Sequence, residues 1–142
     1  MKRILLFAMA LLILLGSVNL CWAYETPEDD VLPEDYLYTS YAEATLTISS
    51  SGAGTINVVC NGNALATRIN AKVYLQKRVN GVWTEIPLNG HSHFLIVEYD
   101  NEMDYTIYTT LSSGTYRVRV YFKVFSDLNY ETFNIYSLPA SC

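Results

Sequence analysis

The sequence predicts an all-β protein, an antiparallel β-sandwich of the immunoglobulin-like type with seven to eight strands. From about residue 42 onward, apolar side chains recur at every second position, a period typical of half-buried strands. Groups of Gly, Asn, Ser and Pro interrupt this alternation at intervals of roughly ten residues. No segment after residue 23 combines an apolar 3.6-residue period with helix caps. A closed β-barrel is the competing architecture.

The first half of the predicted domain divides into strands at distinct turn signals. A Ser- and Gly-rich run at 49–54 and the Asn-Gly-Asn sequence at 61–63 end the first two strands. Asn80-Gly81 joins the next two, because this dipeptide readily adopts the positive φ angles of a tight hairpin. The strands expected in this half lie around residues 42–48, 56–60, 69–75 and 83–86.

The second half contains the most regular alternation, at residues 116–124. One face of this strand carries Tyr, Val and Phe, and the other carries Arg, Tyr and Lys. A turn at Asn89-Gly90 precedes the half, and Ser112-Ser113-Gly114 leads into its longest strand. The other strands expected here lie around residues 94–99, 105–111 and 133–135.

The sequence Gly114-Thr115-Tyr116-Arg117-Val118 resembles the tyrosine corner that opens strand F of immunoglobulin-like domains. In that corner a tyrosine hydroxyl bonds to nearby backbone, and the residue two positions later points into the core. Antibody domains have a cysteine at the later position, where this chain has Val118. The resemblance therefore implies the sandwich but not the inter-sheet disulfide of antibodies.

Residues 1–23 are predicted to be a secretory signal peptide. Two basic residues precede the apolar run Ile4–Leu15, and Cys21-Trp22-Ala23 offers a cleavage site before Tyr24. The run of 12 residues is shorter than the roughly 20 that a bilayer-spanning helix needs. We therefore expect a secreted protein with no stable membrane anchor after signal removal. An uncleaved anchor or a lipid anchor is the alternative.

Residues 24–41 are predicted to be an acidic, Pro-containing leader, and residues 42–142 the sandwich domain. Like charges repel and Pro lacks a backbone donor, so neither helix nor sheet is favoured near the start of the leader. Without the signal, the chain carries seven basic and fourteen acidic side chains, a net charge of −7. This charge favours solubility and argues against nucleic-acid binding.

Two cysteines follow the predicted cleavage site, Cys60 and Cys142. An even number of cysteines in an oxidising compartment allows one disulfide between them. The expected topology opposes it, because the two residues should lie toward opposite ends of the sandwich, whereas a disulfide needs Cα atoms within about 7 Å. The pair is a candidate disulfide with both outcomes open.

Three stretches of the chain resemble a group of small secreted proteins of Gram-positive bacteria whose role is uncharacterised. The resemblance spans about residues 40–137 and implies a β-sandwich and export, with no activity or catalytic residue to transfer. The matching stretches are Ala44-Thr45-Leu46-Thr47-Ile48, then Val73-Tyr74-Leu75-Gln76-Lys77 with Gly81-Val82-Trp83, then Gly114-Thr115-Tyr116-Arg117-Val118 and Glu131.

All seven basic residues after the signal fall on or beside two predicted strands, and these are neighbours in an immunoglobulin-like topology. By alternation, one outward face combines cationic and tyrosine side chains. Such a face suits an anionic ligand, although outward strand positions must be polar in any case. The predicted binding residues are Lys72, Tyr74, Arg117, Arg119, Tyr121 and Lys123.

Other constellations point less clearly to chemistry. Asp100, Glu102 and Asp104 have the spacing of a calcium loop but lack its Gly and its final Glu, so calcium binding there stays open against a solvated loop. His91-Ser92-His93 is the one local coincidence of a nucleophile with imidazoles, and no further zinc ligands lie nearby in sequence. We expect no catalytic site, metal or cofactor.

The function expected from these features is that of a secreted, non-enzymatic binding module for an anionic cell-wall polymer or a surface protein. The alternative is a structural or assembly protein that adds strands at its sheet edges. A secreted hydrolase is a third, weaker alternative.

Overall fold

The computed structural model describes residues 36–142, so the predicted signal peptide and residues 24–35 of the predicted leader lie outside the described residues. All the regular secondary structure within residues 36–142 is β-strand, so the all-β prediction is confirmed for this part of the chain. No helix in it is long and apolar enough to cross a membrane.

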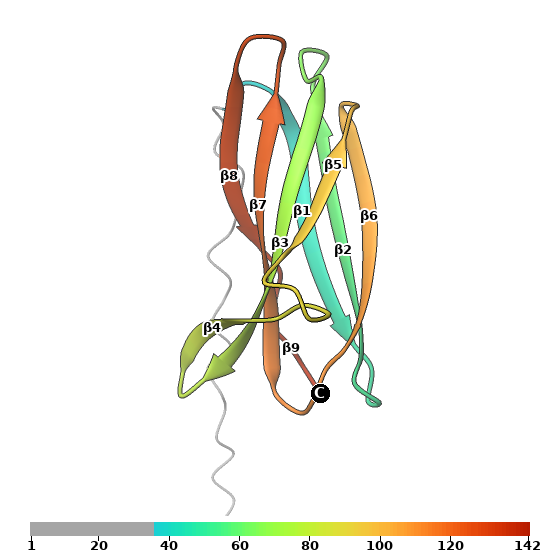
Figure 1. Cartoon of the computed structure of the whole chain (residues 1–142), viewed down its shortest axis with the longest axis vertical. Coiled ribbons are helices and arrows are strands. Elements are labelled where there is room, and N and C mark those ends of the chain that lie inside the picture. Colours follow the sequence, from blue (N-terminus) through green and yellow to red (C-terminus); the bar gives the residue numbers. More distant parts are fainter. Residues whose placement is uncertain (1–35) are drawn as a thin grey trace, which may run out of the picture.

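Nine strands make up the described protein (Figure 1). Eight of them overlap the segments expected from the sequence. The ninth, β9, is only two residues long and was not expected; it forms where the backbones of Cys142 and Gly114 exchange two hydrogen bonds of 3.2 Å. The strands are β1 (Thr39–Ile48), β2 (Ala53–Gly62), β3 (Arg68–Val79), β4 (Val82–Ile86), β5 (Phe94–Glu98), β6 (Glu102–Thr110), β7 (Thr115–Phe125), β8 (Tyr130–Tyr136) and β9 (Ala140–Ser141).

The strands form two sheets in which every paired neighbour is antiparallel. The first sheet has the order β1-β2-β6, and the second has the order β4-β3-β7-β8. β4 and β5 share one edge of β3, because β4 pairs with Leu75–Val79 and β5 pairs with Ile69–Val73. Between β4 and β5 the chain reverses in a second tight turn at Asn89 and Gly90, which have φ angles of 51° and 85°. β5 therefore lies beside the first half of β3.

Apolar side chains from the inner faces of both sheets form one core, as the period of two predicts. β7 shows the alternation most clearly, since Val118, Val120, Phe122 and Val124 are fully buried and the residues between them are partly exposed. The Tyr116 hydroxyl donates a 2.8 Å hydrogen bond to the Ser112 carbonyl, so the predicted corner forms. The two sheets therefore pack together in a sandwich-like arrangement.

The domain begins earlier than residue 42, where the sequence placed its boundary. β1 starts at Thr39, and the Tyr36 ring already packs against Phe133, with ring centroids 4.5 Å apart. The Glu131 carboxylate on β8 accepts hydrogen bonds from the backbone nitrogens of Leu37 and Tyr38, at 2.8 and 3.1 Å. A carboxylate on a distant strand thus fixes the residues that lead into β1, which the composition of the leader does not indicate.

Cys60 and Cys142 do not form a disulfide; both thiols are free. Cys60 lies opposite Met103 at the beginning of β6, whereas the Cys142 thiol donates to the Ser112 carbonyl just beyond the end of β6. Ser112 is nine residues after Met103, which corresponds to about 30 Å of extended chain. Burial raises the pKa of the Cys60 thiol to about 12, with a smaller contribution from Glu131, so this thiol is neutral and unreactive.

Candidate binding face

Lysine and arginine occur on only two strands of the described protein, β3 and β7, which are hydrogen-bonded neighbours in the second sheet. The first sheet, β1-β2-β6, has acidic side chains but no Lys or Arg. The predicted adjacency of the two basic strands is therefore present. The seven residues are Arg68, Lys72, Lys77 and Arg78 on β3 and Arg117, Arg119 and Lys123 on β7.

The register between β3 and β7 brings the six predicted binding residues onto one face. Lys72 lies opposite Tyr121, and Tyr74 lies opposite Arg119. The intervening residues, such as Val73 and Val120, are fully buried on the other side of the sheet. The outer side of β3 and β7 is therefore a continuous cationic and aromatic surface, which we call the cationic face.

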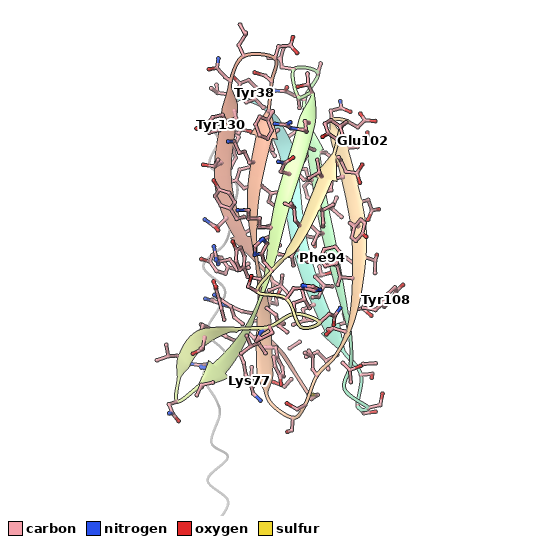
Figure 2. The ribbon with its side chains drawn as sticks, viewed as in Figure 1. Tyr38, Lys77, Phe94, Glu102, Tyr108 and Tyr130 are labelled. Carbon is pink, nitrogen blue, oxygen red and sulfur yellow. The ribbon has the colours of Figure 1, made fainter. Side chains whose placement is uncertain are left out.

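Lys77 does not belong to this face, although it is on the same strand. Its ammonium group donates to the Ser113 carbonyl at 3.1 Å and lies 5.2 Å from the centroid of the Tyr116 ring. Figure 2 shows Lys77 at the lower end of the sandwich, far from Tyr130 at the upper end. Lys77 thus stabilises the turn between β6 and β7.

At one end of the cationic face, which we call the arginine end, guanidinium groups are held by internal acceptors. Arg119 donates to Asn134 Oδ1 at 2.9 Å and to Glu85 Oε1 at 2.6 Å. Its guanidinium carbon lies 4.1 Å from the centroid of the Tyr74 ring. With its side chain 21% exposed, Arg119 is a partly buried, charge-assisted contact between β7, β4 and β8.

Arg117 is held in a similar way at the arginine end. Its Nε donates to Gln76 Oε1 at 2.8 Å, and Gln76 is itself buried. The guanidinium lies between two rings, 4.6 Å from the Trp83 centroid and 4.5 Å from the Tyr136 centroid. Guanidinium–ring contacts of this kind favour a rigid arrangement of both partners.

At the opposite end, which we call the lysine end, Lys72 and Lys123 have no ion pair with any residue of the described chain. Lys72 is exposed. The Lys123 ammonium lies 3.6 Å from the Tyr130 centroid and 4.9 Å from the Phe125 centroid, so its contacts are with rings and not with acceptors. The charges at this end are available to a ligand.

An open hollow of about 320 Å³ lies at the lysine end, between the outer faces of β5, β3 and β7. Three of the predicted residues line it, Lys72, Tyr121 and Lys123, and sequence reasoning missed the other three. Asn70 and Phe125 could have been found from alternation, since they continue the outward rows of their strands. Leu95 could not, because it enters only where β5 pairs with β3 opposite Lys72. The lining residues are Asn70, Lys72, Leu95, Tyr121, Lys123 and Phe125.

Two buried polar atoms beside the hollow have no hydrogen-bond partner in the described structure, Arg68 Nε and Asn70 Oδ1. Unsatisfied buried polar atoms are uncommon and costly in folded proteins. The Arg68 guanidinium carbon is 3.7 Å from the Phe125 centroid, so the group packs against a ring while its Nε has no acceptor. Both atoms are shielded from solvent, so they are not exposed hydrogen-bonding groups of the hollow.

The other predicted constellations are not assembled into sites within residues 36–142. Ser92 and His93 share a 3.1 Å hydrogen bond, but no carboxylate contacts either imidazole in this part of the chain. The His93 ring instead packs 5.4 Å from the Tyr74 ring, at the margin of the cationic face. No group of three or more potential metal ligands is present among the described residues.

No protein-family model matches this chain, and a search of curated proteins finds no significant match.

Proposed function

We propose that this protein is an exported, non-enzymatic binding module with an immunoglobulin-like topology. The sheet orders β1-β2-β6 and β4-β3-β7-β8 correspond to strands A-B-E and C′-C-F-G of that fold. The tyrosine corner opens β7, which takes the place of strand F. β5 departs from the pattern, because it pairs with β3 and not with β6.

The function that we propose is binding of an anionic polymer or an anionic protein surface outside the cytoplasm. The observation that carries it is the confinement of every Lys and Arg of residues 36–142 to two adjacent strands of a net acidic chain. Rings lie against several of these cations, and rings supply rigid contact area at small cost in conformational entropy. A cationic face with the opposite sign to the whole protein orients an anionic partner toward one sheet.

Binding of this kind depends on charge, so it weakens as ionic strength rises. The experiment is retention of the mature protein on immobilised polygalacturonate and lipoteichoic acid, with neutral dextran as the reference, at low and high salt. We expect retention on the anionic matrices alone and release by salt. Retention on dextran equal to that on both anionic matrices would contradict the proposal.

A matched pair of variants separates the cationic face from the overall charge. Lys72→Gln with Lys123→Gln lowers the net charge by two on the cationic face. Thr47→Glu with Thr110→Glu lowers it by the same amount at exposed positions of the first sheet. We expect only the first pair to lose retention.

Strand addition at a sheet edge is the second candidate, and one observation favours it. β8 pairs with β7 on one side and with no strand on the other within residues 36–142. Backbone hydrogen bonds would carry such an interaction, so it should survive high salt, unlike binding to the cationic face. Salt-resistant self-association that a Pro at an edge position of β8 abolishes would favour this candidate.

A further inference from the structure

The hollow at the lysine end combines open volume with lysine charges that have no acceptor partner in the described chain. Its two ammonium groups come from neighbouring strands, because Lys72 lies opposite Tyr121 and Lys123 lies opposite Asn70. Neither has a carboxylate partner in the described chain. Two unpaired cations beside one hollow attract a single oxyanion more strongly than either would alone.

The type of cation indicates how the oxyanion is recognised. Arginine presents a planar fork that selects bidentate geometry, whereas lysine is a compact point charge. Arg117 and Arg119 are already engaged with Gln76, Asn134 and Glu85, and the Arg68 guanidinium packs against Phe125. Lys72 and Lys123 would therefore recognise an anion by its charge and its position between them. Both a carboxylate and a phosphate can be recognised in this way.

The walls of the hollow are apolar and aromatic. Leu95 is 54% exposed, and the rings of Tyr121 and Phe125 are partly exposed on β7. A ligand with charge but no apolar surface would leave these apolar side chains exposed to water, which is unfavourable. The ligand should therefore present a flat apolar side next to its anion, as the C–H face of a sugar ring does.

The shape of the hollow favours one unit of a polymer over an enclosed small molecule. It is open to solvent, and its volume is near the lower limit of the roughly 300–1,000 Å³ found for ligand pockets. Asn70 lines its wall, so the lining includes an amide side chain besides the two lysines. A peptide would instead gain most from main-chain bonding at a strand edge, and the lining consists of side chains on a sheet face.

We propose that this hollow binds an acidic sugar unit of a polysaccharide, with the carboxylate or phosphate between Lys72 and Lys123 and the ring against Tyr121 and Phe125. This inference rests on the proposed function, since it names the ligand class for part of the cationic face. It also assigns different roles to the two ends of the face. The lysine end binds the ligand, and the arginine end holds the strands β4, β3, β7 and β8 in place.

Chemical-shift titration of the mature protein tests the proposal, because it locates the ligand without any mutation. The probes are tetragalacturonate, its fully methyl-esterified form, glucose 6-phosphate, glycerol 3-phosphate and a peptide with the sequence of residues 24–35. We expect tetragalacturonate to shift the amides of Asn70, Leu95 and Lys123, and glucose 6-phosphate to shift the same set more weakly. The methyl ester lacks the charge, so it should bind at least tenfold more weakly than tetragalacturonate. Glycerol 3-phosphate lacks the sugar ring, so it should bind at least tenfold more weakly than glucose 6-phosphate.

Variants then test the roles of single side chains. Lys72→Gln should weaken tetragalacturonate binding about threefold, and the double change with Lys123→Gln about tenfold, as expected for exposed charge pairs. Lys77→Gln is the matched control, because it removes the same charge from the same strand outside the hollow, and its effect should stay below twofold. Tyr121→Leu, which removes the ring but keeps an apolar side chain, should weaken binding severalfold.

The outcomes separate the two proposals. If no anionic probe binds, the proposed function fails and this inference fails with it. If anions bind but shift the arginine end, or if glycerol 3-phosphate binds as tightly as glucose 6-phosphate, the cationic face stands and the sugar-specific hollow is wrong. If the acidic peptide binds in the hollow and tetragalacturonate does not, the ligand class is an acidic peptide and this inference is overturned.

Discussion

The arginine end and the lysine end of the cationic face carry the same sign of charge on the same two strands, yet only one end leaves its charge available. Arg119 donates to Asn134 and Glu85 and lies against a ring, and Arg117 donates to Gln76 and lies against the Trp83 and Tyr136 rings. Lys72 and Lys123 have no acceptor in the described chain. The charge of a cationic side chain on a sheet face is thus available to a ligand only where the neighbouring strands leave it unpaired.

The neighbouring strands explain the difference. At the arginine end, β3 and β7 are flanked by β4 and β8, which supply Glu85 and Asn134. At the lysine end, β5 replaces β4 beside β3 and presents Leu95 opposite Lys72 and Val97 opposite Asn70. An apolar edge cannot satisfy an ammonium group, so the lysines stay unpaired while the apolar side chains form a wall.

The largest expected effect is on stability at the arginine end. Arg119→Gln should lower the free energy of unfolding by about 1–3 kcal/mol, because it removes charge-assisted hydrogen bonds to two strands. Lys72→Gln, the control on the exposed lysine end, should change it by less than about 0.5 kcal/mol. Urea denaturation followed by tryptophan fluorescence measures both. Equal losses in the two variants would remove the distinction between the ends.

A second prediction concerns a variant that gives a lysine an acidic partner, as Arg119 has at the arginine end. Leu95→Glu places a carboxylate directly opposite Lys72, so it should weaken tetragalacturonate binding about threefold, as removal of the Lys72 charge does. Stability should change by no more than about 1 kcal/mol, since the new pair is exposed. Leu95→Gln is the control of equal size without charge. Calorimetric titration that finds the Glu and Gln variants equal would show that the lysine charge is not used.

A smaller effect is expected from the acidic partner at the arginine end. Glu85→Gln should cost about 0.5–1 kcal/mol of unfolding free energy, because the Glu85 side chain is 46% exposed and solvent screens the pair. A double-mutant cycle with Arg119→Gln should recover most of this cost as coupling energy. Additive losses would mean that the two side chains act independently.

The smallest effect concerns the ring that contacts Lys123. Tyr130→Leu should lower the unfolding free energy by about 0.5 kcal/mol, as expected for an exposed cation–ring contact. Tyr108→Leu on the first sheet, where no Lys or Arg is present, is the matched control and should have no measurable effect. In a Lys123→Gln background, Tyr130→Leu and Tyr108→Leu should have the same effect on the unfolding free energy. This result would assign the effect of Tyr130→Leu to the Lys123 charge.

Much of the fold was predictable from local patterns. Alternation identified the inner face of β7, and the dipeptide Asn80-Gly81 identified a hairpin whose residues have φ angles of 52° and 83°. The corner at Tyr116 followed from a motif of five residues. These features depend on neighbours in sequence, for which short-range sterics and the strand period are sufficient.

The candidate site was predictable only in part. Alternation and the expected strand order placed Lys72 and Tyr121 on one face, and the structure brings them together. Neither the alternation nor the expected strand order could show that Arg119 donates hydrogen bonds to Glu85 on β4 and Asn134 on β8. Side-chain partners across strands depend on the register of several strands at once, and register is set by the packing of the whole sheet.

The sequence by itself determined that the described chain is all-β, which residues face inward, and that the basic residues lie on two strands. Local preference and the period of two are properties of single segments, so they can be recognised without the fold. Only the tertiary structure decided that Cys60 and Cys142 stay apart, that Glu131 anchors the start of β1, and that β5 completes a hollow beside unpaired lysines. Each of these depends on contacts between segments distant in the chain, where the packing of both sheets selects one pairing among many that single segments allow.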